Sequence, residues 1–359
     1  MKTLSNFEKI AKKNKQKSWV KIIVISTVIS LLAVLGLVTT LEKMTSRTGV
    51  NVQKRYLKQS EIAYPNIDYT TWGYQATSPF SGTFYSHRTK DIDGITVPFE
   101  KYEGDYFLFL SDSLNQGERL KSGDNGQSAY TYETSYKIPL FFDTAQQKQT
   151  EYKVTQDLNV VPEMTGKAVE VAITFDKPYS LAEIAEKIPE NLKLNWIWIG
   201  SYAPIYSDGD LANQFGFTPY FDASLNAKES RALEKEIDTA MKKNPDANIS
   251  EIYAKYDKKV TPLEGMENSY SIFQTNVQDF LSEGYGSTSR TGEDGKEYST
   301  DQFLKDYLVA NPDPKSAKFA GVILTGRSEN FAQLKDVDWI FASNIGQSVE
   351  IQPYHHLEK

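Results

Sequence analysis

The residue types that most often carry out chemistry in proteins are scarce in this chain. It has no cysteine, and histidine occurs only as His87, His355 and His356. The three histidines do not have the spacing of a metal site. No G-x-S-x-G turn presents a serine to His87, and neither a phosphate-binding P-loop nor a G-x-G-x-x-G motif occurs. We therefore expect a protein that is not an enzyme and that uses no cofactor and no metal.

Acidic residues leave one catalytic alternative open. The chain has 47 of them, so a carboxylate pair that hydrolyses glycans is compatible with the sequence, but their number alone gives it no position. Asp91, Asp93 and Glu100 begin like a calcium-binding loop, yet the pattern stops after Gly94. We expect a plain turn at that point.

Aromatic residues are the one chemical type in surplus, with 22 Tyr, 18 Phe and 5 Trp. Trp72, Trp196, Trp198 and Tyr202 are candidates for a surface that stacks on a sugar or a peptide. Trp196 and Trp198 are two positions apart in a strand-like stretch, so they share one face of that strand. Packing in a hydrophobic core is the competing interpretation. An exposed aromatic surface would suit an extracellular module that binds cell-wall glycan or peptide without a role in transcription.

The element that positions everything else is an apolar run over residues 22–41, which contains no charged residue. Twenty residues at 1.5 Å each span a hydrocarbon core of about 30 Å, and they must be helical there. A cleaved signal peptide has a shorter apolar stretch and a small-x-small site after it, which this sequence lacks. We expect an uncleaved anchor, and the absence of cysteine excludes a lipid-anchored lipoprotein.

Charge predicts the orientation of that anchor. Residues 1–21 carry seven lysines and Glu8, about +6 in total, and the net charge of the whole chain is −7, so about −13 remains for the rest. Lysines before a span hold that end in the cytoplasm. The acidic remainder argues against nucleic-acid binding, which needs basic patches. We expect a single-pass protein of the cell membrane with an extracellular C-terminal domain.

The rest of the chain predicts an α+β protein. Aromatic and β-branched runs with turn residues between them indicate strands from residue 51 to about 165, including 153–161. Two strand–helix–strand units follow, over 168–199 and 320–343, and helices are expected between them near 229–243, 250–256, 270–281 and 303–308, with a mobile loop over 284–299. Ser180 and Glu183 form the S-x-x-E pattern of a capping box. Two such units predict a ferredoxin-like α/β sandwich with inserted helices.

The predicted organisation has five parts. A short basic cytoplasmic stub (1–19) precedes the transmembrane helix (20–41). A β-rich extracellular region (42–165), an extracellular α/β domain (166–352) and a tail (353–359) follow.

Two blocks of sequence resemble a known family. The block VAITFDKPYSLAEIAEKIPENLKLNWIWIGSY and the later block GVILTGRSENFAQLKDVDWIFASNIGQSVEI resemble the C-terminal domain of bacterial sigma factor regulators. The anchor FEKIAKKNKQKSWVKIIVISTVISLLAVL and the stretch NIDYTTWGYQATSPFSGTF resemble the N-terminal region of the same family. The two resemblances together cover most of the chain.

The resemblance implies a single-pass membrane protein that takes part in control of an extracytoplasmic-function sigma factor, without catalysis. Family members that bind a sigma factor directly carry the binding segment before the span, where this chain has only residues 1–19. The His and Cys set of a zinc-containing anti-sigma domain is also missing. The expectation is therefore an indirect, anti-sigma type of regulator that works through a second membrane protein.

Overall fold

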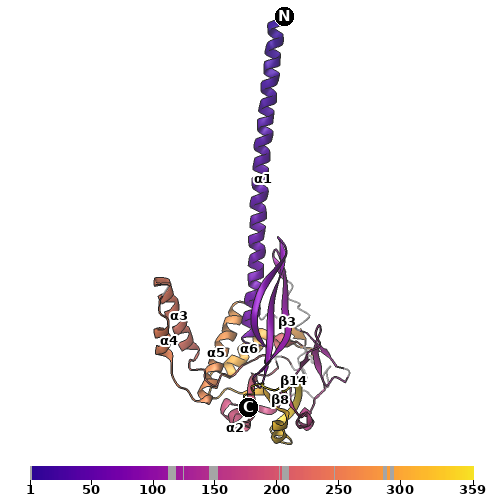
Figure 1. Cartoon of the computed structure of the whole chain (residues 1–359), viewed down its shortest axis with the longest axis vertical. Helices are drawn as coiled ribbons and strands as arrows, with labels where there is room; N and C mark the ends of the chain where they lie inside the picture. The colour runs from indigo at the N-terminus through magenta and orange to yellow at the C-terminus, as the bar shows by residue number, and fades with distance from the viewer. Residues whose placement is uncertain are drawn as a thin grey trace. The chain divides into compact units, whose positions relative to one another are not determined.

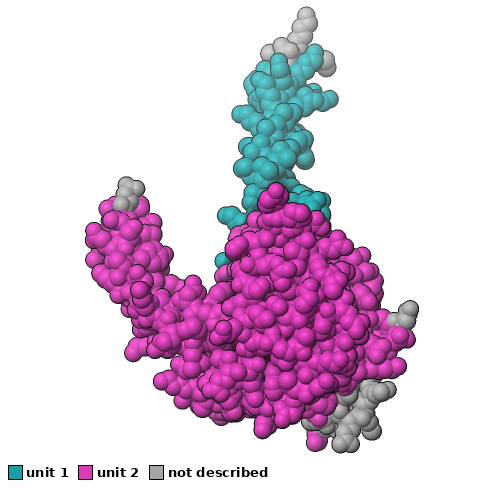
Figure 2. Space-filling model, turned by 60° about the horizontal axis from the view of Figure 1, so that its bottom comes forward, with its two compact units in different colours: residues 1–52, 74–84, 104–113 teal, residues 53–73, 85–103, 114–359 magenta. Residues whose placement is uncertain are grey.

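The computed structural model describes residues 2–111, 119–123, 125–144, 153–201, 203, 210–245, 247–285, 289–291 and 295–359. The chain divides into two compact units (Figure 2). The first unit consists of residues 1–52, 74–84 and 104–113. The second unit consists of residues 53–73, 85–103 and 114–359.

A single helix, α1 (Lys2–Ser60), contains the predicted span and continues well beyond it (Figure 1). In the part of the chain that the structure describes, α1 is the one helix long and apolar enough to cross a membrane. Strands were expected to begin near residue 51, but the helix continues to Ser60, since no proline interrupts the chain between Leu41 and Pro65, and the first strand begins at Asp68. Glycine at position 49 allows the Tyr106 ring to pack closely against the helix, because a Cβ there would come within 2.9 Å of that ring.

A four-stranded sheet of order β1-β2-β3-β4 follows α1. Its strands are β1 (Asp68–Ser78), β2 (Ser81–Ile92), β3 (Ile95–Phe107) and β4 (Leu110–Ser111). Asp93 and Gly94 join β2 to β3 with φ angles of 55° and 86°. Positive φ at both central residues, on the sequence Asp-Gly, is typical of a two-residue hairpin turn. The plain turn expected there is confirmed.

The second unit is built on a five-stranded sheet of order β10-β9-β13-β8-β14 in which all neighbours are antiparallel. The strands are β8 (Lys167–Tyr179), β9 (Lys193–Trp198), β10 (Gly216–Phe217), β13 (Phe319–Arg327) and β14 (Ile340–Glu350). Helix α2 (Leu181–Lys187) connects β8 to β9, and the 3-10 helix η5 (Ser328–Leu334) connects β13 to β14. The predicted capping box at Ser180 and Glu183 is confirmed.

Among the described residues between β9 and β13, four α-helices occur, as predicted: α3 (Ala227–Lys243), α4 (Ser250–Tyr256), α5 (Pro262–Ser282) and α6 (Thr300–Ala310). Aromatic rings hold α5 against the sheet: Phe273 packs on Phe217 of β10, and Tyr270 packs on Phe319 of β13. The segment predicted as a mobile loop contains a short hairpin, β11 (Ser289–Thr291) and β12 (Glu297–Ser299).

One predicted strand is replaced by turns. Residues 153–161 form part of two 3-10 helices, η2 (Asp157–Asn159) and η3 (Val161–Glu163). Hydrogen bonds to β14 decide this geometry: Thr155 Oγ1 donates to the Ser343 carbonyl (2.6 Å), and the Asp157 carboxylate accepts from the Ile345 amide (2.8 Å). Long-range partners therefore override the local strand propensity. Upstream, β5 (Leu120–Ser122), β6 (Ala129–Thr131) and β7 (Lys137–Ile138) form a small three-stranded sheet.

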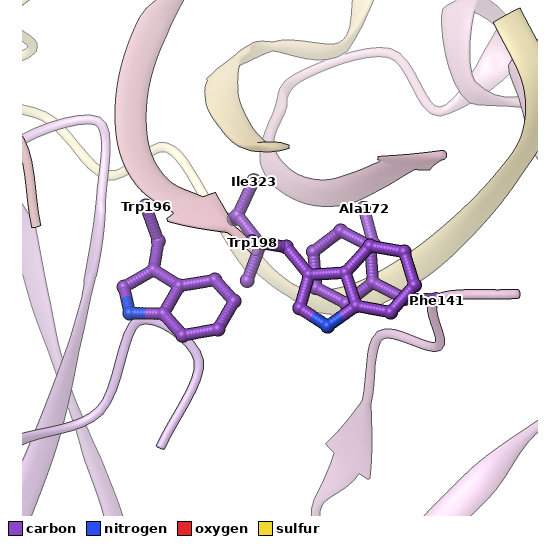
Figure 3. Close-up of a cluster of buried hydrophobic side chains, with 5 residues drawn as sticks. All are labelled: Phe141, Ala172, Trp196, Trp198 and Ile323. Carbon is purple, nitrogen blue, oxygen red and sulfur yellow. The ribbon is translucent and has the colours of Figure 1, made fainter. Parts of the chain in front are cut away.

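The five-stranded sheet is buried on both faces. Trp196, Trp198, Ala172 and Ile323 share one face, and Phe141 from the segment after β7 covers them (Figure 3). Ile197 points to the opposite face and is fully buried as well. The core of the second unit therefore lies on both sides of this sheet.

Candidate functional site

The structure describes three of the four aromatic residues proposed from the sequence, and it separates Trp72 from Trp196 and Trp198. Trp196 and Trp198 are almost completely buried, and Phe141 stacks on Trp198 with ring centroids 4.7 Å apart (Figure 3). Trp72 lies on β1 and is 46% exposed, outside that cluster. Tyr202 lies outside the described residues. The two tryptophans of β9 therefore act first as core residues, although Trp196 also lines a cavity.

That cavity, of about 400 Å³, lies where α1 passes into β1. Its inner wall is apolar and aromatic, formed by buried residues that include Tyr64, Trp196, Phe217 and Phe273. The polar residues at its edge are exposed: Glu61, Asp68, Tyr69 and Tyr220. The cavity thus combines an apolar interior with an acidic and phenolic rim, which is the usual construction of a small-molecule site.

One backbone and one side-chain hydrogen bond fix the segment that forms one wall of the cavity. The Gly216 amide donates to the Ile62 carbonyl (2.9 Å), and Gln59 Nε2 donates to the Ala212 carbonyl (2.8 Å). Gly216 is required, because a Cβ there would lie 2.5 Å from the Trp196 ring and 2.1 Å from the Ile197 carbonyl oxygen. The last turn of α1 and the residues after it are therefore bonded directly to the edge strand β10 and the segment before it.

The turn out of α1 uses unusual backbone conformations. Tyr64 and Asn66, on either side of Pro65, have φ angles of 68° and 51°. Such angles are uncommon outside glycine, and asparagine is among the residues that tolerate them best. They redirect the chain so that Tyr64 faces the cavity while Glu61 and Asp68 flank its opening.

Both rim carboxyls have shifted pKa values. The surrounding protein excludes part of the water from Glu61 and Asp68, which raises the pKa of each carboxyl. The neighbouring charge raises each pKa further, from Asp68 in the case of Glu61 and from Asp91 in the case of Asp68. Loss of solvation also raises the pKa of the Tyr69 and Tyr220 hydroxyls. Lys58 opposes the shift at Glu61 and Lys193 opposes the shift at Asp68, but only in part, so a further positive charge at the rim would stabilise the ionised carboxylates.

A buried ion pair lies behind the cavity wall. Lys90 Nζ of β2 donates to both carboxylate oxygens of Glu170 on β8, each at 2.8 Å, and the two side chains are 1% and 0% exposed. Asn66 Nδ2 donates to the same carboxylate at 2.8 Å, and the Gln347 amide donates at 3.0 Å. Burial lowers the pKa of Lys90, although the Glu170 charge opposes that shift.

The polar network extends from Asn66 across the sheet. Asn195 Nδ2 on β9 donates to Asn66 Oδ1 (3.1 Å) and to the Asp91 carbonyl (3.0 Å). Thr325 Oγ1 on β13 donates to Asn195 Oδ1 (2.6 Å). Asn66 thus belongs to the segment that lines the cavity, and its side chain is also bonded to Asp91 of β2, Glu170 of β8 and Asn195 of β9.

Sequence reasoning missed this site. The signal for it was present only in part: Glu61, Tyr64, Asp68 and Tyr69 fall within nine residues just after the anchor helix. Two acids among 47 carry no information by themselves, and apart from Tyr64 the inner wall comes from residues about 125 to 215 positions further along the chain. In the residues that the structure describes, no group of three or more potential metal ligands is found.

Comparison with protein families gives two matches. The model described as sigma factor regulator N-terminal matches residues 8–97. The model described as sigma factor regulator C-terminal matches residues 161–347. Neither a curated protein nor a solved structure matches the chain.

Proposed function

The chain belongs to the sigma factor regulator family, and we propose that it is a membrane-anchored regulator that binds a ligand outside the membrane and thereby controls a sigma factor. The family is regulatory, and the description of its two models supports a role in control of a sigma factor. The role proposed here is of the anti-sigma type.

The anchor in this proposal is the apolar part of α1. Residues 22–41 of the helix are uncharged, and most of their large apolar side chains are exposed. Seven lysines lie before the start of the apolar run. Their charge favours a cytoplasmic N-terminus and an extracellular α/β domain.

The α/β domain is proposed to be a ferredoxin-like sandwich with inserted helices. Strands β8, β9, β13 and β14 have the spatial order β9-β13-β8-β14, with a short helical crossover in each half. That order, with antiparallel neighbours, is the arrangement of two interlocked strand–helix–strand units. It supports the assignment made from the sequence.

The observation that carries the ligand-binding part is the cavity at the end of α1. The helix is continuous from the apolar run to Ser60, and Ser60 and Glu61 line the cavity. A ligand bound in the cavity would contact the residues that bond the end of α1 to the domain. Its binding can therefore change the conformation of α1 directly, with no other helix or strand between them. The rim favours a molecule with an apolar body and a cationic group, such as an amine-bearing cell-wall peptide.

Contact with the sigma factor is proposed to pass through a second membrane protein. Before the apolar run, α1 carries seven lysines, and of its exposed large apolar residues Trp19 and Val20 adjoin the run, which leaves Phe7 and Ile10 further out. Within the apolar run, Ser26, Ser30 and Gly36 are small residues that allow a second helix to approach closely. Helix pairing in the membrane is therefore the route that we favour.

The proposal is tested by calorimetric titration of the full-length protein in nanodiscs. Phenethylamine is the cationic probe, and phenethyl alcohol is its uncharged counterpart. We expect binding of the amine only, and loss of that binding in the Glu61→Gln/Asp68→Asn variant. The matched control is Glu234→Gln/Asp238→Asn, which makes the same charge change on α3. Equal binding of the two probes, or full binding by the cavity variant, would refute the proposed site.

A further inference from the structure

Two hairpin ends of the first unit expose large apolar side chains. The turn between β1 and β2 contains Phe80, and the turn between β3 and β4 contains Leu108. The Leu108 amide donates to the Phe80 carbonyl (3.0 Å), so the two turns lie side by side. Next to them Phe109 and Leu110 are 65% and 70% exposed, and Phe107 is half exposed. Three such neighbouring side chains form a contiguous apolar patch, which marks an interaction surface.

The patch lies just beyond the membrane-facing part of α1. Thr48 Oγ1 of the helix donates to the Leu108 carbonyl. A groove at the same place is lined by Glu42 and Thr45 of α1 and by Pro79 of the first turn. Figure 1 shows the strands running beside α1 in this region. The hairpin ends therefore contact the helix within a few residues of Leu41, the last residue of the apolar run.

The depth of the patch follows from helix geometry. At 1.5 Å per residue, Thr45 and Thr48 lie about 6 and 10 Å beyond Leu41 along the axis. The headgroup layer of a bilayer adds roughly 5–8 Å on each side of the hydrocarbon core. Thr45 is thus level with the headgroups, and Thr48 lies roughly 2–5 Å beyond them. Lys43 and Arg47, both exposed on α1, are at the same level and can pair with lipid phosphates.

We propose that the lipid surface itself covers this patch, with Phe107, Phe109 and Leu110 inserted into the headgroup region beside α1. The inference rests on the proposed membrane anchor, and it adds a second attachment that the anchor does not require. Bulky apolar side chains at the tip of a turn are suited to this depth, because their burial needs no backbone group to enter the hydrocarbon. The first unit would then be held against the membrane at two places, by α1 and by its hairpin ends.

The absence of cysteine allows a direct test by site-specific spin labelling. Phe109→Cys, Leu32→Cys and Val309→Cys are made separately in the full-length protein and reconstituted in nanodiscs of phosphatidylethanolamine and phosphatidylglycerol. Leu32 lies inside the apolar run, and Val309 is an exposed apolar residue of α6. Accessibility of each label to oxygen, which concentrates in lipid, is compared with accessibility to a water-soluble nickel chelate.

We expect the label at Phe109 to be several-fold less accessible to the nickel chelate than the label at Val309, and the label at Leu32 to be the least accessible. Adding Leu110→Glu to the Phe109→Cys protein should return its label to water. A label at Phe109 that matches Val309, while Leu32 is in lipid, would refute the surface contact alone. A label at Leu32 exposed to the chelate would refute the anchor, and the surface contact with it. A patch covered by a protein partner instead of lipid would also leave Phe109 exposed to the chelate, because the nanodiscs contain no partner.

Discussion

At the scale of single residues, the Lys90–Glu170 ion pair is a contact of the second unit that we expect to be costly to disrupt. Both charged groups are buried, and the carboxylate also accepts from Asn66 and from the Gln347 amide. A buried pair contributes little net stability compared with apolar residues, but removing one partner leaves the other charge unpaired. The pair is therefore a sensitive position for substitution.

Lys90→Met should destabilise the folded protein by about 3–5 kcal/mol, because Glu170 loses its counterion without regaining water. The measurement is urea unfolding of the full-length protein in detergent, followed by near-UV circular dichroism. Lys90→Met/Glu170→Gln is the control: it removes the stranded charge while keeping an acceptor for Asn66, and most of the loss should be recovered. A cost below about 1 kcal/mol for the single substitution would mean that water reaches the site.

The cavity carboxyls predict a pH-dependent stability with a definite sign. A raised pKa in the folded state means that the folded protein disfavours the charged forms of Glu61 and Asp68. The penalty is complete above the folded pKa values and disappears as the pH falls to the ordinary carboxyl values. Glu61→Gln/Asp68→Asn should therefore raise the melting temperature at pH 7 and leave it unchanged at about pH 3. Thermal unfolding at the two pH values, beside Glu234→Gln/Asp238→Asn, checks the sign, and a lower melting temperature at pH 7 would contradict it.

At the scale of elements, local patterns were predicted well from the sequence. The capping box before α2 depends only on Ser180 and Glu183, three residues apart, and it was found as expected. The amphipathic pattern of α3 and the apolar spacing of α5 also lie within single helices. Each of these signals is complete within a few turns of chain, so no distant partner was needed to recognise it.

Elements decided by distant partners were predicted poorly. The strand expected over residues 153–161 became 3-10 turns, because Thr155 and Asp157 bond to β14 nearly 190 residues later. The cavity has the same character: Glu61 and Phe273 line it together, and nothing in the spacing of the sequence relates them. Contacts between residues so far apart in the sequence can be identified only when the order of the strands in the sheet is known.

Strand β9 gives a prediction at the element scale. Trp196 and Trp198 share a buried face with Phe141 and Ile323, so Trp196→Ala or Trp198→Ala should each cost about 3–5 kcal/mol of unfolding free energy. Val309→Ala on the exposed side of α6 is the control and should change stability by less than about 0.5 kcal/mol. Chemical denaturation of the three full-length variants in detergent measures these changes in unfolding free energy. A loss of unfolding free energy below about 1 kcal/mol for both tryptophan variants would contradict the core interpretation and favour the interpretation of a ligand-binding surface.

At the scale of the whole molecule, charge asymmetry along the chain predicts the membrane orientation. The lysines before the apolar run predict a cytoplasmic N-terminus. Protease added to wall-stripped intact cells should therefore digest the domain after Met44 and spare the N-terminal part. Replacing most of those lysines with glutamate should scramble the orientation, which protease protection of an N-terminal tag would report. Unchanged insertion of the glutamate variant would contradict the charge argument.

The family and the membrane-spanning length of the apolar helix were both recognisable from the sequence, because an apolar run and an ordered set of strand and helix blocks are read along the chain. The cavity that we propose as the ligand site was not recognisable. It depends on the fold bringing the end of α1 against β9, β10 and α5, which no local pattern encodes.

The most direct test of the proposed regulator is the transcriptional response of sigma-dependent promoters. Transcript profiling would compare deletion of the gene, Glu61→Gln/Asp68→Asn and the control Glu234→Gln/Asp238→Asn under envelope stress. We predict that the deletion changes the promoters of one extracytoplasmic-function sigma factor, that the cavity variant changes the same set, and that the control leaves it unchanged. If the deletion left every sigma-dependent promoter unchanged under envelope stress, the central claim would be wrong.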